Sequence, residues 1–168
     1  MTSSTRLARL RVVDEEVMHR LGIALANLLN AGDLVLLTGP LGAGKTTLSR
    51  GIGEGLGVIG TVSSPTFVIA RTHRRVGSSV TLVHVDAYRL SSPAEFDDLD
   101  IDLANSIVLV EWGRGFTDQL SESWLDIEIE RDHTGATEER VLTIIGHGPR
   151  FESDAAKHSF ETLSEVTE

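Results

Sequence analysis

Gly39-Pro40-Leu41-Gly42-Ala43-Gly44-Lys45-Thr46 is the segment that decides the predicted fold. It matches the phosphate-binding loop, in which a glycine and four further residues precede Gly-Lys-Thr. The glycines let the backbone turn tightly and point successive N–H groups at phosphate oxygens. Lys45 can reach the β- and γ-phosphates, and the Thr46 hydroxyl can bind Mg²⁺. The segment therefore predicts a binding site for a nucleoside triphosphate.

The residues on either side of this loop decide between a true match and a chance one. Residues 34–38, Leu-Val-Leu-Leu-Thr, form a short apolar run that is typical of a strand buried on both faces. Residues 46–52 can form a helix whose N-terminus faces the bound anion. A glycine turn with an accidental Lys-Thr would need neither neighbour, so the strand and the helix favour the phosphate loop.

Length and charge limit the possible functions. A chain of 168 residues is large enough for one domain with a real core, but not for two. The formal net charge of −10, without any basic block, argues against a broad grip on the phosphate backbone of nucleic acid, DNA included. We expect any contact with RNA to pass through a partner protein.

The sequence contains no cysteine, which excludes disulfides and thiol chemistry and fits a cytosolic protein. Residues 1–6 lead into no apolar core of signal-peptide length, and no apolar run approaches the span of a bilayer. We therefore expect a cytoplasmic protein that makes no use of a membrane.

Apolar periodicity predicts the strands. We expect them at residues 7–13, 34–38, 67–72, 80–85, 107–110, 125–130 and 140–145. Residues 67–72 and 80–85 should form a hairpin through a turn that contains Gly77. The last two strands should pair with each other in an antiparallel hairpin. Residues 125–130 alternate apolar with acidic side chains, so one face of that strand should lie in water.

Capping signals mark the helices. Asp14 is suited to cap a helix whose apolar residues recur at helical spacing, and Gly32 should end that helix. The helix after the phosphate loop should end among the glycines of residues 53–60. Ser92-Pro93-Ala94-Glu95 is a capping box that opens a short helix.

These elements predict an α/β protein with a P-loop NTPase-like three-layer fold. Its central sheet should be mixed and partly parallel, with an antiparallel hairpin at the C-terminal side. We expect a single ATPase domain over residues 1–148. Residues 149–168 form a tail with a weak apolar stripe, which is compatible with a helix or with disorder.

Two acidic residues follow apolar strands and are candidates for a metal site. Asp86 follows Leu-Val-His-Val at residues 82–85, and Glu111 follows Ile-Val-Leu-Val at residues 107–110. The carboxyl ends of strands are the edge at which α/β sheets place ligands, and Mg²⁺ prefers oxygen ligands. Either carboxylate could bind the metal while the other orients water. A solvated acid at a strand end is the alternative for each of them.

Four supporting residues lie beside these acids in the sequence. His84 is two residues from Asp86, so both side chains would face the same side of a strand, in a catalytic or a purely structural role. Tyr88 and Trp112 can pack beside a nucleotide or cover the core. Arg89 can offset phosphate charge or lie free in solvent.

Five segments occur in an order and spacing that resemble a known family. They are the helix start at Asp14-Glu15, residues 39–47, Ser64-Pro65-Thr66-Phe67, His84-x-Asp86-x-Tyr88-Arg89 and Val110-Glu111-Trp112. The phosphate loop is generic, whereas the last three segments in combination are specific. Over about residues 12–131 the chain resembles the TsaE (YjeE) family, small bacterial ATPases needed to make threonylcarbamoyladenosine in tRNA.

The resemblance implies roles for the catalytic residues. It implies Thr46 and Glu111 at the Mg²⁺ of bound ATP, and Asp86 beside the metal and the γ-phosphate. From the residues alone, the choice of metal ligand between the two acids stays open. Together with Lys45, these two acids would carry the catalysis.

The resemblance also implies how the nucleotide and the partner are recognised. The nucleotide would be held along residues 39–47, including Thr47, with Glu15 near the base. A loop at Ser64, Pro65 and Thr66 would sense the nucleotide and meet the partner.

The family's partners are the transferase TsaD and its paralogue TsaB, whose turnover the P-loop protein supports. The expected activity is thus a Mg²⁺-dependent ATPase that is weak alone and activated by these partners. Two alternatives stay open: a nucleotide-gated assembly module with incidental hydrolysis, and a small-molecule kinase. A kinase would usually need an arginine-rich lid over the phosphates, and the sequence contains no such helical segment.

Overall fold

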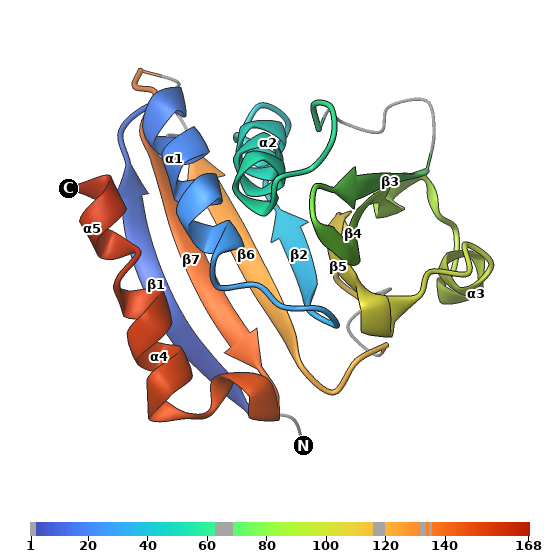
Figure 1. The fold of residues 1–168 in the computed structure, drawn as a ribbon. Coiled ribbons are helices and arrows are strands. Elements are labelled where there is room, and N and C mark those ends of the chain that lie inside the picture. Colours follow the sequence, from blue (N-terminus) through green and yellow to red (C-terminus); the bar gives the residue numbers. More distant parts are fainter. Residues whose placement is uncertain (1–2, 63–68, 116–119, 132–133, 135) are drawn as a thin grey trace.

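The computed structural model describes residues 3–62, 69–115, 120–131, 134 and 136–168 (Figure 1). Within these residues the strands form one seven-stranded sheet in the order β1-β7-β6-β2-β5-β4-β3. The strands are β1 (Ser4–Val12), β2 (Leu34–Thr38), β3 (Ala70–Arg75), β4 (Ser78–Asp86), β5 (Ser106–Glu111), β6 (Trp124–Arg131) and β7 (Arg140–His147). The helices are α1 (Glu15–Ala26), α2 (Lys45–Leu56), α3 (Pro93–Asp97), α4 (Asp154–Glu161) and α5 (Ser164–Thr167), with short 3-10 turns η1 (Ala87–Arg89), η2 (Leu103–Asn105) and η3 (Pro149–Phe151).

The sheet is mixed, as the sequence predicted. Strand β2 runs parallel to β5 on one side and to β6 on the other, and β4 runs parallel to β5. The β6–β7, β1–β7 and β3–β4 pairs are antiparallel. The partly parallel sheet and the antiparallel hairpin at its C-terminal side are therefore confirmed.

Alternate residues of β2 face opposite sides of the sheet, and each side has its own core. Val35 and Leu37 pack in a large cluster with residues of α1, α2 and α4. Leu34 and Leu36 pack in a smaller cluster that includes Phe96 of α3. The fold thus has three layers with unequal cover: the longer helices lie on one face, and the short α3 lies near β4 and β5 on the other side of the molecule (Figure 1).

Helices α1 and α2 approach each other closely because glycines line their contact. A Cβ atom on Gly22 of α1 would lie 2.5 Å from the carbonyl oxygen of Leu48, and one on Gly55 of α2 would lie 2.7 Å from that of Ile23. No real Cβ tolerates such distances, so larger side chains here would push the two helices apart. Helix α2 continues through its glycines to Leu56 and ends at Gly57, whose φ of 72° suits a helix C-terminus.

Three local expectations need correction. Helix α1 ends at Ala26, and not at Gly32, because its last amides tighten into i→i−3 bonds and Gly32 instead donates to Ser106. Strand β6 has no fully solvated face, because Asp126 is buried beside the side chains of His147 and Arg114. Helix α3 begins at the predicted capping box, but its Glu95 carboxylate accepts from the backbone N–H of Ser91 and not from that of Ser92.

Arginines occupy both edges of the sheet. Strand β1 at one edge displays three exposed arginines, and β3 at the other edge carries three more. They are Arg6, Arg9, Arg11, Arg71, Arg74 and Arg75.

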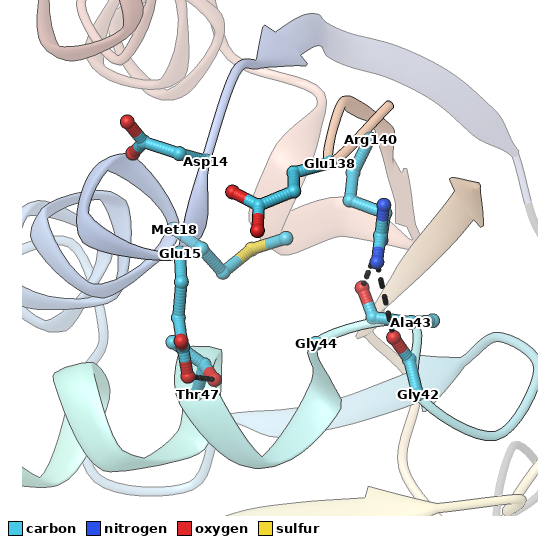
Figure 2. A pocket seen from close by; sticks show the side chains of 9 residues that line it. All are labelled: Asp14, Glu15, Met18, Gly42, Ala43, Gly44, Thr47, Glu138 and Arg140. Atoms are coloured by element: carbon cyan, nitrogen blue, oxygen red, sulfur yellow. Dashed lines mark hydrogen bonds between the residues drawn. The ribbon is translucent and has the colours of Figure 1, made fainter. Parts of the chain in front are cut away.

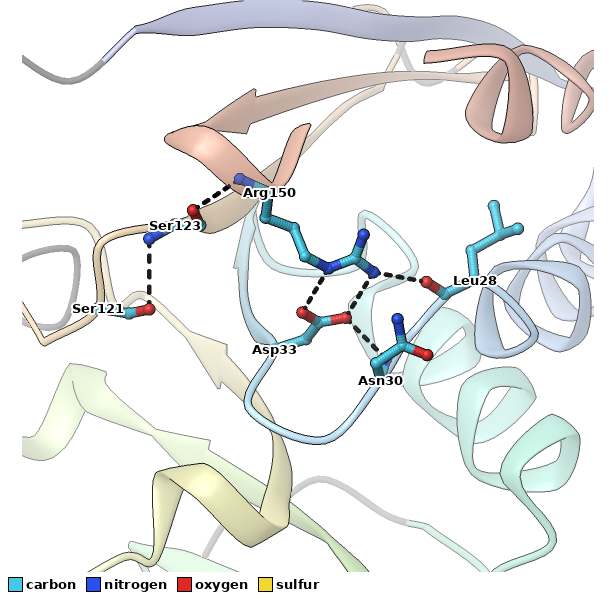
Figure 3. A network of polar contacts seen from close by, with 6 residues as sticks. All are labelled: Leu28, Asn30, Asp33, Ser121, Ser123 and Arg150. Carbon is cyan, nitrogen blue, oxygen red and sulfur yellow. Dashed lines mark hydrogen bonds and ion pairs between the residues drawn. The ribbon is translucent and has the colours of Figure 1, made fainter. Parts of the chain in front are cut away.

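The segment after residue 148 is helical and packs on the core. Phe160 of α4 and Leu163 are buried in the large cluster, and the Phe160 ring meets Phe151 edge to face at 5.9 Å. The Arg150 guanidinium donates to both carboxylate oxygens of Asp33 at 2.9 Å and to the carbonyl of Leu28 at 2.9 Å (Figure 3). We propose that residues 149–168 belong to the same folded unit as residues 1–148.

We therefore expect Phe160→Ala to destabilise the whole domain by about 3–5 kcal/mol, the usual cost of emptying a phenylalanine site in a core. The matched control is His158→Ala on the exposed side of α4, which should change stability by less than about 0.5 kcal/mol. Urea unfolding of both variants measures the difference. Equal unfolding midpoints would mean that the tail contributes nothing to the domain.

Candidate nucleotide-binding site

The phosphate loop joins β2 to α2 in the predicted place. It spans residues 39–44, and α2 begins at Lys45. Gly42 and Gly44 have φ values of 78° and 109°, which ordinary side chains rarely adopt. A Cβ atom on Gly39 would lie 2.8 Å from the carbonyl oxygen of Ile129 in β6. Glycine is therefore required for backbone shape at two of these positions and for space at the third.

Lys45 is held beneath this loop with little access to water. Its Nζ donates to the carbonyl oxygens of Gly39 at 2.6 Å and Pro40 at 3.1 Å. The same ammonium lies 4.6 Å from the centre of the Trp112 ring. Burial lowers the pKa of Lys45, and the negative charges of Glu111 and Asp86 offset part of that shift. The two acids thus act on the lysine of the phosphate loop across the cleft.

The two candidate acids are neighbours at the same edge of the sheet. Asp86 ends β4 and Glu111 ends β5, and the parallel register places them opposite each other. Glu111 is buried, and its Oε2 lies 3.0 Å from Nε2 of His84, which is fully buried. Asp86 is half-buried and its Oδ1 accepts from the backbone N–H of Tyr88. The acid that ends β5 is thus held more deeply than the acid that ends β4.

Trp112 and Tyr88 form one wall of the site. Trp112 follows β5 with a φ of 62°, a conformation that is unusual for a large side chain and that turns the chain sharply after Glu111. Its backbone N–H donates to Leu37 of β2 at 3.2 Å. The rings of Trp112 and Tyr88 are 5.8 Å apart and tilted, so the tryptophan that covers Lys45 is braced by the tyrosine.

These residues enclose a cleft of about 700 Å³. Its lining consists of Glu15, Leu41, Gly42, Ala43, Gly44, Lys45, Thr46, Thr47, Asp86, Tyr88, Glu111 and Trp112. The size is typical of a site for a small organic ligand. Many of the residues singled out in the sequence meet here, although they come from α1, the phosphate loop, β4 and β5. The exceptions are Gly39, Pro40, His84 and Arg89, which do not line the cleft, and Ser64, Pro65 and Thr66, which lie outside the described residues.

A smaller cavity of about 230 Å³ adjoins the other side of the phosphate loop (Figure 2). It is lined by Asp14, Glu15, Met18, Gly42, Ala43, Gly44, Thr47, Glu138 and Arg140. Glu15 accepts a hydrogen bond from the Thr47 hydroxyl at 3.1 Å, which links α1 to α2. The Arg140 guanidinium donates to the carbonyls of Ala43 and Gly42 at 3.2 and 3.3 Å.

Sequence reasoning missed Glu138 and Arg140, which follow from the fold alone. Strand β7 lies two strands away from β2, beyond β6, and its alternating pattern carries no sign that its first residue reaches the phosphate loop. Only the position of β7 in the sheet places Arg140 there. Its guanidinium engages the carbonyl oxygens of Ala43 and Gly42 and so ties the phosphate loop to the start of β7.

Comparison with known proteins agrees with this site. A family model described as "Threonylcarbamoyl adenosine biosynthesis protein TsaE" matches residues 12–141. The chain is 54% identical over 138 residues to a TsaE protein of Streptomyces coelicolor, covering 80% of this chain and 93% of that one. It is 48% identical over 120 residues to a TsaE protein of Mycobacterium bovis, covering 66% and 71% of the two chains. The chain belongs to the TsaE family.

A solved structure supports the fold of this TsaE-family chain along almost its whole length. The crystal structure of YdiB from Bacillus subtilis superposes with a TM-score of 0.70 and 28% identity, covering 98% of this chain and 97% of YdiB. The resemblance inferred from the sequence is therefore confirmed. In the part of the chain that the structure describes, no helix is long and apolar enough to cross a membrane.

Two of the roles that the TsaE resemblance implies stay untested. Ser64, Pro65 and Thr66 lie outside the described residues, so the predicted nucleotide-sensing loop stays a prediction. Arg89 is the last residue of the η1 turn that follows Asp86, and its proposed effect on phosphate charge also stays a prediction.

Lys45 should cost the protein stability at neutral pH. Its pKa in the folded state lies below the ordinary 10.5, so between that lowered value and 10.5 the unfolded chain binds more protons than the folded one. The penalty is present below the folded-state pKa and disappears as the pH rises to 10.5. We expect Lys45→Met to be at least as stable as the wild type at pH 7, with a difference that shrinks toward alkaline pH. Urea unfolding from pH 7 to about pH 10 measures this, and a variant less stable than the wild type at pH 7 would contradict it.

Proposed function

We propose that this chain is a Mg²⁺-dependent ATPase that works as a subunit of the machinery making threonylcarbamoyladenosine in tRNA. The observation that carries the proposal is the convergence of Lys45, Thr46, Asp86 and Glu111 on one cleft. These residue types are the ones that phosphoryl transfer needs: a cation for the phosphates, a hydroxyl for the metal and carboxylates for metal and water. The printed names of the relatives supply the pathway.

The nucleotide phosphates would lie against the loop N–H groups and the N-terminus of α2, where backbone dipoles favour an anion. Lys45 would supply a charge-assisted contact to the β- and γ-phosphates from its place under the loop. The base would lie toward Glu15, on the side of the smaller cavity (Figure 2). This arrangement uses both cavities that meet at Gly42 to Thr47.

The donors in the cleft fit Mg²⁺, because the Thr46 hydroxyl and the carboxylates of Glu111 and Asp86 are hard oxygen ligands. Among the described residues, no three histidines, cysteines or acids gather tightly enough to hold a metal by themselves. This suits an ion that keeps waters and binds together with phosphates. When bound, Mg²⁺ neutralises charge that develops on the phosphates.

The two acids differ in their surroundings, which supports different roles. Glu111 is buried, and a hydrogen bond fixes one of its oxygens, as suits a metal ligand. Asp86 is more open to the cleft, which suits an acid that orients the attacking water. Lys45 and Asp86 would then act on the phosphate and the water, while Glu111 holds the metal.

The exposed residues at the rim of the cleft favour the binding of a partner protein there. Leu41 at the tip of the phosphate loop is 91% exposed and Tyr88 is 75% exposed, although both are apolar or aromatic. An open site gives up electrostatic stabilisation to water, and a partner seated on this rim would restore it. We propose that the partners are a TsaD-like transferase and its TsaB-like paralogue, in the cytoplasm, with tRNA reached only through them.

The same rim favours one alternative function, a nucleotide-gated assembly module whose hydrolysis is incidental. In that case ATP would tighten the partner complex, and the partner would tighten ATP by the same factor. The rate of ATP hydrolysis in the presence of the partners separates the two functions. A nucleotide-gated module would bind its partners more tightly with ATP, but the partners would not speed its hydrolysis of ATP.

The first test of the proposal is ATP binding by Lys45→Met. Loss of the charged contact should weaken binding of ATP, or slow its turnover, by about a hundredfold or more. Lys157→Met in α4, far along the chain from the cleft, is the matched control and should bind as the wild type does. Equal ATP binding by the two variants would contradict the proposal that the loop containing Lys45 binds the phosphates of ATP.

The second test is steady-state ATP hydrolysis, alone and with the TsaB and TsaD homologues of the same organism. We expect slow turnover alone and an increase of about tenfold or more with the partners, because closure of the cleft excludes water. Leu41→Ser should lower this stimulation. Val76→Ser, which alters an apolar residue of similar exposure in the β3–β4 turn, should not. Fast turnover that the partners leave unchanged would favour a free-standing enzyme.

A further inference from the structure

His84 is the most deeply buried polar residue at the site, and the proposed chemistry does not use it. Its side chain has no exposure to solvent, and its Nε2 lies 3.0 Å from Oε2 of Glu111, whose side chain is 6% exposed. The two residues come from adjacent parallel strands, β4 and β5. The burial of both partners means that water does not compete for this hydrogen bond.

A metal ligand at Glu111 would be an ionised carboxylate, whose oxygens only accept hydrogen bonds. With Glu111 in that form, Nε2 of His84 is the donor in the contact between the two side chains. Nδ1 of His84 is buried and has no hydrogen-bond partner within the described part of the chain. A proton on Nδ1 would therefore be a buried donor without an acceptor, which is costly.

The contact leaves the second oxygen of Glu111 uncommitted. Oε2 is occupied by His84, whereas Oε1 makes no hydrogen bond to any described residue, and Glu111 lines the cleft beside Thr46. A glutamate has several rotatable bonds, so without a partner its carboxylate would sample other orientations. His84 holds one oxygen and thereby restricts the position of the other.

We infer that His84 is a positioning residue, which fixes the Glu111 carboxylate through its Nε2–H so that Oε1 is ready to bind Mg²⁺. The inference rests on the proposed function, because it takes Glu111 as the metal ligand. It also gives a role to a buried histidine whose Nδ1 has no partner among the described residues. Partners of this kind set the orientation of a metal ligand and typically change metal affinity by 10- to 100-fold.

His73 provides a matched control on the neighbouring strand. Strand β3 pairs with β4, and the residue opposite His73 is Leu82, two positions before His84, so both imidazoles point to the same side of the sheet. His73 also has a buried, unpaired Nε2, but no contact with Glu111 is recorded for it in the described structure. Its pKa is lowered by burial first and then by His84 and Arg71, which keeps it neutral near pH 7. Replacing it tests the loss of a buried imidazole without loss of the contact to Glu111.

The experiment measures binding of a fluorescently labelled ATP, first in EDTA and then during a titration with MgCl₂. We expect His84→Leu to raise the Mg²⁺ concentration at half-effect by about tenfold or more, with affinity in EDTA within about twofold of the wild type. His84→Gln keeps an N–H donor near the place of Nε2 and should stay within about threefold of the wild type. His73→Leu should show the wild-type Mg²⁺ dependence, and Glu111→Gln should lose as much as His84→Leu or more.

The outcomes separate this inference from the proposed function. Failure of the wild type to bind labelled ATP would contradict the proposed function itself. Binding with a Mg²⁺ dependence that is the same in wild type and His84→Leu would overturn the role of His84 alone. An equal loss of affinity in EDTA would also overturn it, because a merely structural role acts with or without metal.

A second measurement does not depend on how any variant folds. Nitrogen-15 NMR of the ligand-free wild type reports which imidazole nitrogen of His84 is protonated. We expect a proton on Nε2, where it is donated to the Glu111 carboxylate. A ring with its proton on Nδ1 and none on Nε2 could not donate to Glu111, and the inference would then be wrong whatever the Mg²⁺ titrations show.

Discussion

Burial of β2 on both faces, with a parallel partner on each edge, is the constraint on which the rest of the structure depends. Four consecutive apolar side chains alternate between two cores, so a slip of one residue would exchange the contents of both. This register fixes where β2 ends and hence where the phosphate loop begins. It also sets the position of Glu111, because β5 pairs with β2 residue by residue up to Leu37 and Glu111. The position of the loop and of the acid is therefore a consequence of how β2 packs into the two cores.

The parts of the fold that depend on local chemistry could be predicted from the sequence. Glycines at Gly39, Gly42 and Gly44 mark backbone shapes that other residues do not adopt, and Asp14 accepts from the N–H of Val17 as a helix cap should. Apolar runs before Asp86 and Glu111 reveal strands buried on both sides. Each of these signals is carried by a few adjacent residues, and tertiary structure has little freedom to override it.

The remaining parts depend on which strands become neighbours, and a single sequence does not contain that information in its local pattern. Asp126 has the alternation of a half-exposed strand, yet it is buried beside His147 of β7, which the strand order β2-β6-β7 brings next to it. Arg140 reaches the phosphate loop only because of the same order. The pairing of His84 with Glu111 likewise needs the parallel alignment of β4 and β5, although the two residues are 27 positions apart in the chain. Local sequence patterns thus identified residues of the site but not the contacts between them.

The arginines on the two outer strands bear on how the protein behaves at high concentration. The edge of an open sheet offers unpaired backbone groups to any other extended chain, and identical edges are the most available partners for each other. Here, side-by-side pairing of two copies of β1, or of two copies of β3, would bring several guanidinium groups together with like charge. The repulsion makes such pairing unfavourable, and on β3 it adds to a bridge between Val58 and Arg75 that already pairs part of that edge. A chain with an overall acidic character thus protects the two margins of its sheet from fibrous self-association by concentrating positive charge there.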